Sequence, residues 1–484
     1  MRRVEVPPRP NSIKLLKSQG LVYADMPGLT KDQPYWPDDR YYSFTSEEIE
    51  LIEEAGKDVF GMCCEAAEYL VQNPDVIVNR MAIPAFALQQ IKESWHRDPS
   101  WGSVYGRFDF SFGGLDHPDP QLRLPKFYEF NADTPTSLVE AACAQWHWLE
   151  QTGQGQDQFN SIAERLVEAW KRNLDLIQKK IGHPVKVHFA IGMGDDSGEE
   201  VMNLALLMDT CQQAGWLTKS LFMEQIQMHP DGRFHDHEGE HIDVLFKLYP
   251  YEFLAEEAAA EAVFKDMNRV GLRDANGKYI GGTVWIEPPY KMLWSNKALF
   301  AILWQLFKDD PRSKWLLPTY FESEKPESLT KYARKPIFSR EGKGITLVDD
   351  GNVLVDASTS EFGKEGFIVQ ELSVPAKFED GKGNNMYAVP GLWFVDGESA
   401  GMGIREDSGP ITSNSSVFTP HSISDGPLQY TPSKVPTLDE IDASLSIYKS
   451  LSDGGHTGLP TDIHNLIYHS DFAPDQVVVV ETVT

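Results

Sequence analysis

Residues 126–137 read KFYEFNADTPTS, and the spacing of side chains in this stretch decides the fold that we predict. In an extended strand, successive side chains point to opposite faces. Glu129 and Asn131 are therefore expected on one face, and Tyr128 and Phe130 on the other. For an isolated strand, the solvated face of an antiparallel sheet is the simpler interpretation. The alternative is a row of ligands for a hard cation.

A second stretch, YGRFDFSFGG at 105–114, repeats the same period of two and places Arg107 and Asp109 on one face. We expect two adjacent antiparallel strands whose polar rows face the same way. Asp109, Glu129 and Asn131 would then offer two carboxylates and an amide oxygen, the set that Mg²⁺ or Mn²⁺ prefers when phosphates complete the shell. Arg107 could neutralise charge on a phosphoryl or tetrahedral centre, or simply pair with a carboxylate.

After the second of these strands, ADTPTS leads into a predicted helix, SLVEAACAQWHWLEQ. Its expected cap is Thr136 or Ser137, and Glu140 would complete a capping box from Ser137. A helix N-terminus beside the polar row favours an anion, such as a substrate carboxylate.

Other helices are indicated by their end signals. A capping box from Thr45 to Glu48 predicts a long helix after it, and another helix is expected from about Phe159 to Ile181, ending at Gly182. Strand and helix patterns alternate after Gly182 as in an α/β layer.

These patterns divide the chain into four expected segments. They are an N-terminal part with the metal-ligand strands (1–182), an inserted α/β substrate-binding subdomain (183–283), a nucleotide-binding portion (284–422) and a C-terminal extension with one helical pattern (423–484).

The composition excludes some partners. Among 484 residues, 44 Lys and Arg stand against 72 Asp and Glu, a net charge of −28 that argues against nucleic acid and anionic membranes. It is compatible with a cationic or amine substrate. The four cysteines show no CxxC spacing, and the N-terminus has no apolar signal region. The longest aliphatic run is Val477–Val480, so we expect no membrane span and a cytoplasmic location.

Two clusters are open to a structural and a functional interpretation. The loop HPDGRFHDHEGEH at 229–241 holds four histidines, which suggests either a transition metal or, preferably, a solvated hairpin. Glu199 and Glu200 follow Gly198 at the start of a predicted helix. They either stabilise the helix end or contact an amine of a substrate.

Basic residues downstream suggest phosphate contacts. Lys297 begins an apolar helix, where a cation requires an anionic partner or solvent. Lys335 lies on a predicted strand before Arg340 and the glycines Gly342 and Gly344, whose backbone N–H groups could surround phosphates. The pattern is neither a Walker A motif nor a Rossmann fingerprint, and a plain hairpin is the alternative.

Several motifs occur together in one order. They are YGRFDFSF, KFYEFNADTPTS, the GEE helix start, EPPYKMLWSNKALF, YARKPIFSREGKGI, FIVQEL, GLWFVDGESAGMGIRED and SNSSVFTPH. Over about residues 15–422, this series resembles the glutathionylspermidine synthase family, in its synthetase domain only and without an amidase domain.

The resemblance implies an α/β (α+β), ATP-grasp-like fold with mixed sheets flanked by helices. It also implies an ATP- and Mg²⁺-dependent ligase that activates a carboxylate as an acyl phosphate, which an amine then attacks. The expected substrates are a small peptide or amino-acid carboxylate and an amine or polyamine.

The family's site residues carry over position by position. The implied magnesium ligands, for two ions, are Asp109, Glu129 and Asn131. The implied catalytic arginines are Arg107 and Arg405. Contacts to ATP are implied for Arg107, Lys297, Lys335, Arg340, Gly342, Gln370 and Glu371, with loop 339–344 closing as a lid. Substrate contacts are implied for Thr134, Thr136, Glu199 and Glu200. Leu248 departs from the family, which has a hydroxyl residue there.

Two other functions fit parts of the sequence. One is a non-catalytic or diverged nucleotide-binding protein that acts through a partner recruited by residues 423–484. The other is a metal-independent hydrolase with Asp109 and Glu129 as acid and base, which the neighbouring Arg107 and Asn131 disfavour.

Overall fold

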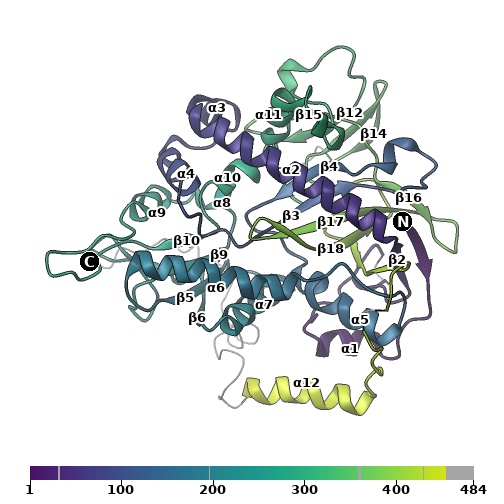
Figure 1. Cartoon of the computed structure of the whole chain (residues 1–484), viewed down its shortest axis with the longest axis horizontal. Coiled ribbons are helices and arrows are strands. Elements are labelled where there is room, and N and C mark those ends of the chain that lie inside the picture. The colour runs from purple at the N-terminus through teal and green to yellow at the C-terminus, as the bar shows by residue number, and fades with distance from the viewer. Residues whose placement is uncertain (31–32, 196, 358–360, 429, 454–484) are drawn as a thin grey trace.

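The computed structural model describes residues 1–30, 33–195, 197–357, 361–428 and 430–453. Helices and several sheets pack around two large clusters of buried side chains, and Figure 1 shows the helices flanking the sheets. The predicted fold class, α/β with mixed sheets flanked by helices, is confirmed. The four-segment division of the chain stays a prediction.

A six-stranded antiparallel sheet forms the centre of the molecule. Its strands run in the order β19-β18-β17-β3-β4, and β16 pairs with β17. Their bounds are β3 (Tyr105–Ser111), β4 (Lys126–Asn131), β16 (Ala376–Glu379), β17 (Asn385–Val395), β18 (Glu398–Asp407) and β19 (Val417–Thr419). The long helix α2 (Ser46–Gln72) contacts this sheet and begins at the predicted capping box of Thr45 and Glu48.

The pairing of β3 with β4 confirms the predicted antiparallel neighbours. Arg107 lies opposite Asn131, and Asp109 lies opposite Glu129. A bulge follows, because Phe110 pairs with Phe127 and so leaves Tyr128 as an extra residue. The prediction that Tyr128 faces away from Glu129 is therefore wrong: both side chains line the same cavity.

A parallel sheet carries the middle of the chain, in the order β10-β9-β5-β6. Its strands are β5 (Lys186–Ile191), β6 (Leu217–Phe222), β9 (Val244–Leu248) and β10 (Val284–Ile286). The helices α6 (Ile162–Ile181) and α7 (Glu199–Gln213) pack with each other, and α7 covers β5 and β6. The predicted alternation of strands and helix is confirmed, and α6 ends at Gly182 as expected.

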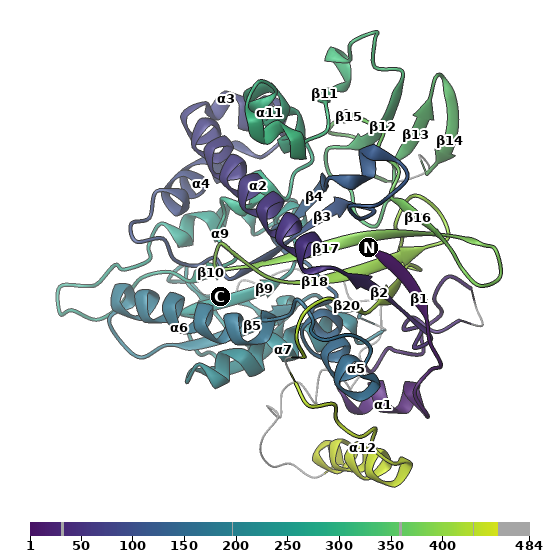
Figure 2. The same cartoon turned by 45° about the vertical axis from the view of Figure 1, so that its right-hand side comes forward.

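A third sheet, of five antiparallel strands, lies beside the central sheet, as Figure 2 shows. Its order is β11-β15-β12-β13-β14, with bounds β11 (Thr319–Phe321), β12 (Lys331–Pro336), β13 (Thr346–Asp349), β14 (Asn352–Asp356) and β15 (Phe367–Glu371). The apolar helix α11 (Ala298–Phe307) packs against β11 and β15.

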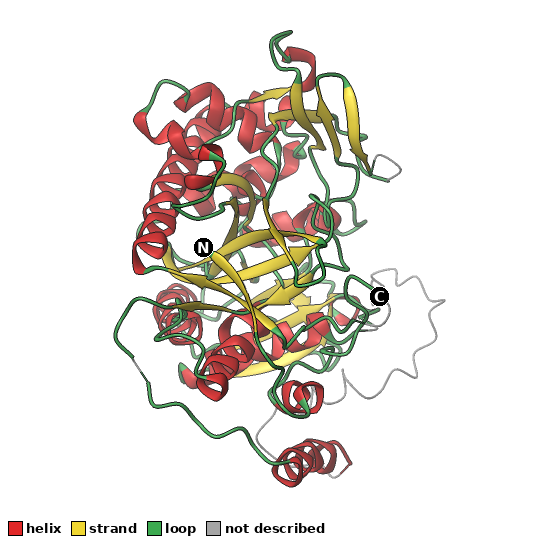
Figure 3. Ribbon diagram, turned by 90° about the vertical axis from the view of Figure 1, so that its right-hand side faces the viewer, coloured by secondary structure: helices red, strands yellow, loops and turns green. Residues whose placement is uncertain are grey.

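Smaller elements complete the fold, and Figure 3 shows them by type. The small sheets are β1 (Arg2–Glu5) with β2 (Arg40–Phe44) and β20 (His421–Ile423), and the hairpin β7 (Gln227–Met228) with β8 (Phe234–His235). The other α-helices are α1 (Ser12–Ser18), α3 (Pro74–Arg80), α4 (Leu88–Trp95), α5 (Gln145–Thr152), α8 (Tyr251–Leu254), α9 (Ala260–Met267), α10 (Lys291–Trp294) and α12 (Leu438–Asp453). Over the described ranges, no helix is both long enough and apolar enough to cross a membrane. The run Val477–Val480 lies outside those ranges.

The capping box predicted for Ser137 and Glu140 is wrong. Ser137 has a positive φ of 69°, and the helix's first free N–H, from Leu138, donates to Asn203 Oδ1 at 2.9 Å. Glu140 instead turns inward and accepts a hydrogen bond from Tyr35. The side chain of Asn203, on α7, thus takes the capping role from another part of the chain, which no local pattern signals.

Candidate active site

Two adjoining cavities lie beside the central sheet, and the smaller one is enclosed on its other side by the five-stranded sheet. The smaller, of about 90 Å³, contains Lys297 and Lys335, and we call it the lysine chamber. The larger, of about 260 Å³, contains Arg107, Arg340 and Arg405, and we call it the arginine chamber. Their shared lining consists of Asp109, Glu129, Gly342, Val389 and Thr412. The two sheets therefore enclose the lysine chamber from opposite sides, the arrangement expected of an ATP-grasp-like fold, while loop 339–344 and the start of α7 complete the arginine chamber.

The boundary between the chambers is formed by the polar row of β3 and β4. Arg107 donates to both carboxylate oxygens of Asp109, at 2.7 and 3.1 Å, and Asn131 donates its amide N–H to the same group at 3.0 Å. Burial alone would lower the pKa of Arg107, but the Asp109 carboxylate raises it, so the guanidinium stays charged. Arg107 thus pairs with a carboxylate, one of the two roles that its sequence suggested, and it lines the arginine chamber. Its action on a phosphoryl or tetrahedral centre stays a prediction.

Glu129 joins the two chambers electrostatically. Lys297 Nζ lies 2.6 Å from Glu129 Oε1 and donates a second bond to the carbonyl of Ser339 at 2.7 Å. Burial would raise the pKa of Glu129, but the Lys297 ammonium lowers it below its ordinary value. The anionic partner that Lys297 requires is therefore a carboxylate predicted to hold metal.

Lys335 brings a buried ammonium to the lysine chamber without a carboxylate partner among the described side chains. It donates to Gln370 Oε1 at 2.6 Å and to the Tyr128 carbonyl at 3.4 Å. Burial lowers the pKa of Lys335 to about 8. The remaining lining is mostly apolar, and includes Ala333, Ile345, Leu347, Pro375 and Val389. The chamber thus combines a cation with an apolar slot.

Arg405, on β18, supplies a second cation that no described carboxylate neutralises by an ion pair. Its guanidinium donates to the carbonyls of Ser413 and Ser416, both at 3.0 Å, and weakly to Ser137 Oγ at 3.4 Å. Its Nε is buried and has no hydrogen-bond partner in the described part of the chain. The arginine chamber is therefore suited to an anionic group.

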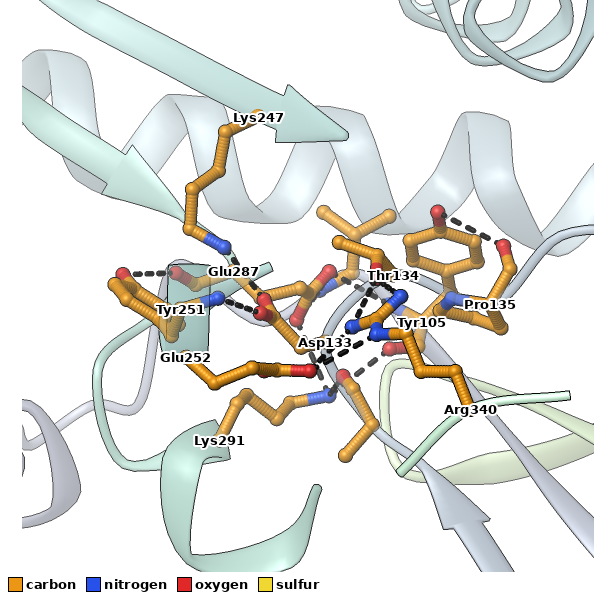
Figure 4. Close-up of polar contacts among 12 residues, drawn as sticks. Tyr105, Asp133, Thr134, Pro135, Lys247, Tyr251, Glu252, Glu287, Lys291 and Arg340 are labelled. Carbon is orange, nitrogen blue, oxygen red and sulfur yellow. Dashed lines mark hydrogen bonds and ion pairs between the residues drawn. The ribbon is translucent and has the colours of Figure 1, made fainter. Parts of the chain in front are cut away.

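Loop 339–344 lines both chambers, and two of its residues contact distant segments. Arg340 bonds the Glu252 carboxylate at 2.8 Å and reaches the Thr134 hydroxyl at 3.3 Å, as Figure 4 shows. Gly342 has a φ of 70°, and a Cβ there would come within 2.5 Å of the Thr412 carbonyl oxygen. Only glycine fits this approach without displacing backbone.

A buried ion pair fixes the segment that follows β4. Lys247 Nζ, on β9, lies 2.6 Å from Asp133 Oδ1, and Asp133 Oδ2 accepts the backbone N–H of Tyr251 at 2.8 Å (Figure 4). Asp133 therefore ties Thr134, its neighbour in sequence, to the helix that carries Glu252. This brings the parallel sheet to the edge of the arginine chamber.

Glu199 and Glu200 also line the arginine chamber. They do not cap α7, because Asp195 accepts the N–H groups of Gly198 and Val201, at 2.9 and 3.0 Å. Burial, together with the charges of Asp195 and Glu199, raises the pKa of Glu200 to about 7. Burial also raises the pKa of Glu199, although Arg405 opposes the shift. Asp195 rather than these acids therefore accepts the free N–H groups, although both acids lie in the first turn of α7, the position that the helix-end interpretation requires.

Every predicted site residue lines one or both chambers. The arginine chamber contains Arg107, Asp109, Glu129, Asn131, Thr134, Thr136, Glu199, Glu200, Arg340, Gly342 and Arg405. The lysine chamber contains Asp109, Glu129, Lys297, Lys335, Gly342, Gln370 and Glu371. Leu248 is buried in the core and lines neither chamber. The chemical roles of these residues stay predictions.

The sequence did not reveal three residues that shape the site. Glu252 and Asp133 are single acids without a repeating pattern, and their importance follows from contacts with distant segments. Tyr35 lies in an irregular, proline-rich lead-in and reaches the arginine chamber from far upstream. A folded chain is needed to identify such residues.

The histidine loop forms the solvated hairpin β7–β8, in which the rings of His229 and His235 stack at 3.9 Å. Nearby, His188, Asp236 and Glu240 are close enough to share a cation. The ammonium of Lys219 already lies 2.6 Å from Asp236 and 3.8 Å from Glu240. A lysine therefore supplies the positive charge in this cluster.

Comparison with known proteins places the chain in a family. The sequence profile described as glutathionylspermidine synthase preATP-grasp matches residues 3–424. A Haemophilus influenzae protein, provisionally named an acid–amine ligase, is 34% identical over 87% of this chain and 99% of its own length. The chain belongs to the glutathionylspermidine synthase family. It is an enzyme of the ligase class, as the names of its relatives indicate.

Two longer relatives match less of their own length. The trypanothione synthetase of Crithidia fasciculata is 27% identical over 72% of this chain and 51% of its own. The bifunctional glutathionylspermidine synthetase/amidase of Escherichia coli is 26% identical over 78% of this chain and 58% of its own. A glutathione synthetase-like effector from Globodera pallida covers 87% of this chain and all of its own, at 10% identity and a TM-score of 0.47.

Proposed function

We propose that the protein is an ATP- and Mg²⁺-dependent carboxylate–amine ligase that forms an amide through an acyl phosphate. One observation carries this proposal. The carboxylates of Asp109 and Glu129 lie on the boundary between a chamber with two lysines and a chamber with three arginines and several acids. A nucleotide on one side and a carboxylate on the other would meet at that boundary.

The residues at the boundary fit magnesium. Asp109, Glu129 and Asn131 would hold it, and the described lining of both chambers includes no histidine or cysteine that would favour zinc. The family resemblance implies two ions, and two carboxylates and an amide would leave coordination positions for phosphate oxygens. Bound magnesium would supply charge neutralisation at the phosphates.

The lysine chamber fits ATP. Lys335 and Lys297 would contact phosphate oxygens, and Gln370 with Glu371, at the end of β15, would face the adenine among apolar side chains. Loop 339–344, with Arg340 and Gly342, would cover the phosphates. Excluding water in this way protects an acyl phosphate from hydrolysis.

The arginines would act on the reacting groups. Arg107 and Arg405 face the chamber from β3 and β18 and would offset repulsion between the substrate carboxylate and the γ-phosphate. Removing one such donor typically costs about 10²–10³ in rate.

The acid and the amine would occupy the arginine chamber together. Thr134 and Thr136 present hydroxyls for a peptide or amino-acid substrate, while Glu199 and Glu200 would attract a protonated amine. The names of the Escherichia coli and Crithidia fasciculata relatives make glutathione and spermidine the first pair to test.

A screen for ADP release tests the proposal. Peptides and amino acids would be crossed with amines and polyamines in the presence of MgATP, with mass spectrometry of the products. We expect at least one pair to yield ADP and an amide in equal amounts, and Glu129→Ala to abolish both. ATP binding without ADP release for any pair would instead support a non-catalytic nucleotide-binding protein.

A further inference from the structure

A buried tyrosine–glutamate pair lies directly behind the lining of the arginine chamber. Tyr35 lines the chamber and donates its hydroxyl proton to Glu140 Oε1 at 2.6 Å. Glu140 is fully buried, and its Oε2 has no hydrogen-bond partner among the residues that the structure describes. Burying a carboxyl group while one of its oxygens lacks a hydrogen bond lowers the stability of the fold, which suggests that the arrangement serves a function.

The local backbone is unusual at the same point. Glu140 begins a π-helical turn, Glu140–Ala144, which precedes α5. Such turns are rare and frequently occur at functional sites. The turn directs Glu140 inward, between Tyr35 and the apolar core.

The charges around Glu140 favour proton exchange near neutral pH. Burial raises the pKa of Glu140 to about 7, and the nearby Glu199 carboxylate adds to this, while the hydrogen bond from Tyr35 opposes it. The other ionisable groups close by are Tyr23, beside Tyr35, Arg405, and Cys143 on the same turn as Glu140. Burial raises the pKa of Tyr35 well above its ordinary value. The Tyr35 hydroxyl therefore gives up its proton only when it receives another proton in exchange.

We propose that Tyr35 and Glu140 together accept the proton that the bound ammonium ion must lose before its nitrogen can attack. This inference rests on the proposed ligase function. The ammonium nitrogen first gives one proton to Tyr35 Oη while the phenolic proton of Tyr35 moves to Glu140 Oε1, and the carboxylate becomes a carboxylic acid. The neutral nitrogen then forms a bond to the acyl carbon as the bond from that carbon to the phosphate oxygen breaks. Inorganic phosphate leaves with the electron pair of that bond and takes the second proton of the nitrogen.

This assignment separates two tasks among the acids. Glu199 and Glu200 would attract the amine as an ammonium ion, which cannot attack carbon. Tyr35 lines the chamber and is hydrogen-bonded to Glu140. It can therefore pass the proton to a carboxyl group other than the acids that bind the amine.

A comparison of two nucleophiles distinguishes a defect in proton removal from a defect in substrate binding or folding. Spermidine reaches the enzyme protonated, whereas hydroxylamine is unprotonated at neutral pH and traps an acyl phosphate as a hydroxamate. Tyr35→Phe and Glu140→Gln would be assayed with MgATP, the acid selected by the screen, and each nucleophile. We expect amide formation from spermidine to fall about 10²-fold or more and hydroxamate formation to stay unchanged.

A matched pair serves as control. Tyr249 also donates to a glutamate, Glu257, at 2.6 Å, but Tyr249 is only half-buried, Glu257 is exposed, and neither residue lines a chamber. Tyr249→Phe and Glu257→Gln should leave both reactions unchanged. At saturating spermidine, the wild-type rate should also rise through about pH 7, as Glu140 ionises, and this rise should disappear in Glu140→Gln.

Three results would overturn the inference. Equal loss with both nucleophiles would assign the pair a structural role, and unchanged rates with both would show that it is not used. Selective loss in Glu199→Gln rather than Glu140→Gln would make Glu199 the proton acceptor. A wild-type enzyme that releases no ADP with any pair would contradict the ligase proposal itself.

Discussion

Lys297 Nζ lies 2.6 Å from Glu129 Oε1, so an ammonium proposed to contact phosphate is paired with a carboxylate proposed to hold magnesium. Each offsets the cost of burying the other. Binding of MgATP would exchange this contact for two others, metal to Glu129 and phosphate to Lys297. We therefore expect the metal and nucleotide sites to fill together.

Glu129→Gln tests this coupling. The variant keeps the size of the side chain but removes the charge, so Mg²⁺ should no longer tighten ATP binding, and the thermal shift with MgATP should disappear. Ligase activity should fall by at least about 10²-fold. Calorimetric titration of ATP with and without Mg²⁺ measures the effect. Glu65→Gln, which alters an exposed pair with Arg312, should behave as wild type. A Mg²⁺ dependence that persists in Glu129→Gln would contradict the coupling.

Lys335→Met should change stability and ATP affinity in opposite directions. The pKa of Lys335, about 8 when folded, lies below its ordinary 10.5, so the buried charge costs stability at pH 7 and this cost declines as pH rises above 8. The variant should melt higher at pH 7 yet bind ATP about tenfold or more weakly.

The pH dependence provides the check. Wild-type affinity for ATP should decline above about pH 8, as the lysine loses its proton, and Lys335→Met should show no such decline. Calorimetry and thermal melting across pH 6–10 would measure both. Equal pH profiles in the two proteins would argue against a phosphate contact by Lys335.

Gly342→Ala should separate ATP consumption from amide formation. An alanine Cβ would lie within 2.5 Å of the Thr412 carbonyl, so the loop could not pack over the chambers. We expect more ADP than amide, because water would reach the acyl phosphate. Gly351→Ala is the control: it has a similar φ of 83° but open space around its Cβ. Equal yields of amide per ADP in both variants would contradict a covering role.

Glu200→Gln should weaken amine binding in a pH-dependent way. Since the pKa of Glu200 is raised to about 7, wild-type KM for the amine should fall as pH rises through 7 and the carboxylate forms. The variant should show a high, constant KM. It should also gain stability relative to wild type at pH 8 but not below pH 4.5, because the folded state favours the protonated acid. Glu261→Gln, which changes an exposed glutamate, is the control.

Local sequence was sufficient where a pattern and its partner lie close together. The capping box of Thr45 and Glu48 located the start of α2, and the period of two in residues 105–111 and 126–131 gave the pairing of β3 with β4. The lysines and glycines between 297 and 344 were recognised with the family's motifs.

Local sequence failed where the deciding contact is distant. The helix after Ser137 is capped by Asn203, and the helix that begins at Glu199 is capped by Asp195. The bulge places Tyr128 on the same face of the strand as Glu129. Each error came from assuming that neighbouring residues satisfy one another, whereas side chains from other segments did so.

The bulge in β4 also constrains how this site could evolve. By adding one residue, it lets a single strand present Tyr128 to one chamber and Asn131 to the other while Phe127 and Phe130 stay in the core. Deleting Tyr128 alone would remove the bulge and keep the facing of Phe127 and Glu129, whereas deleting any other residue of the strand would reverse the facing of everything on one side of it. Length changes should therefore be tolerated in the loop 112–125 and selected against within the strand.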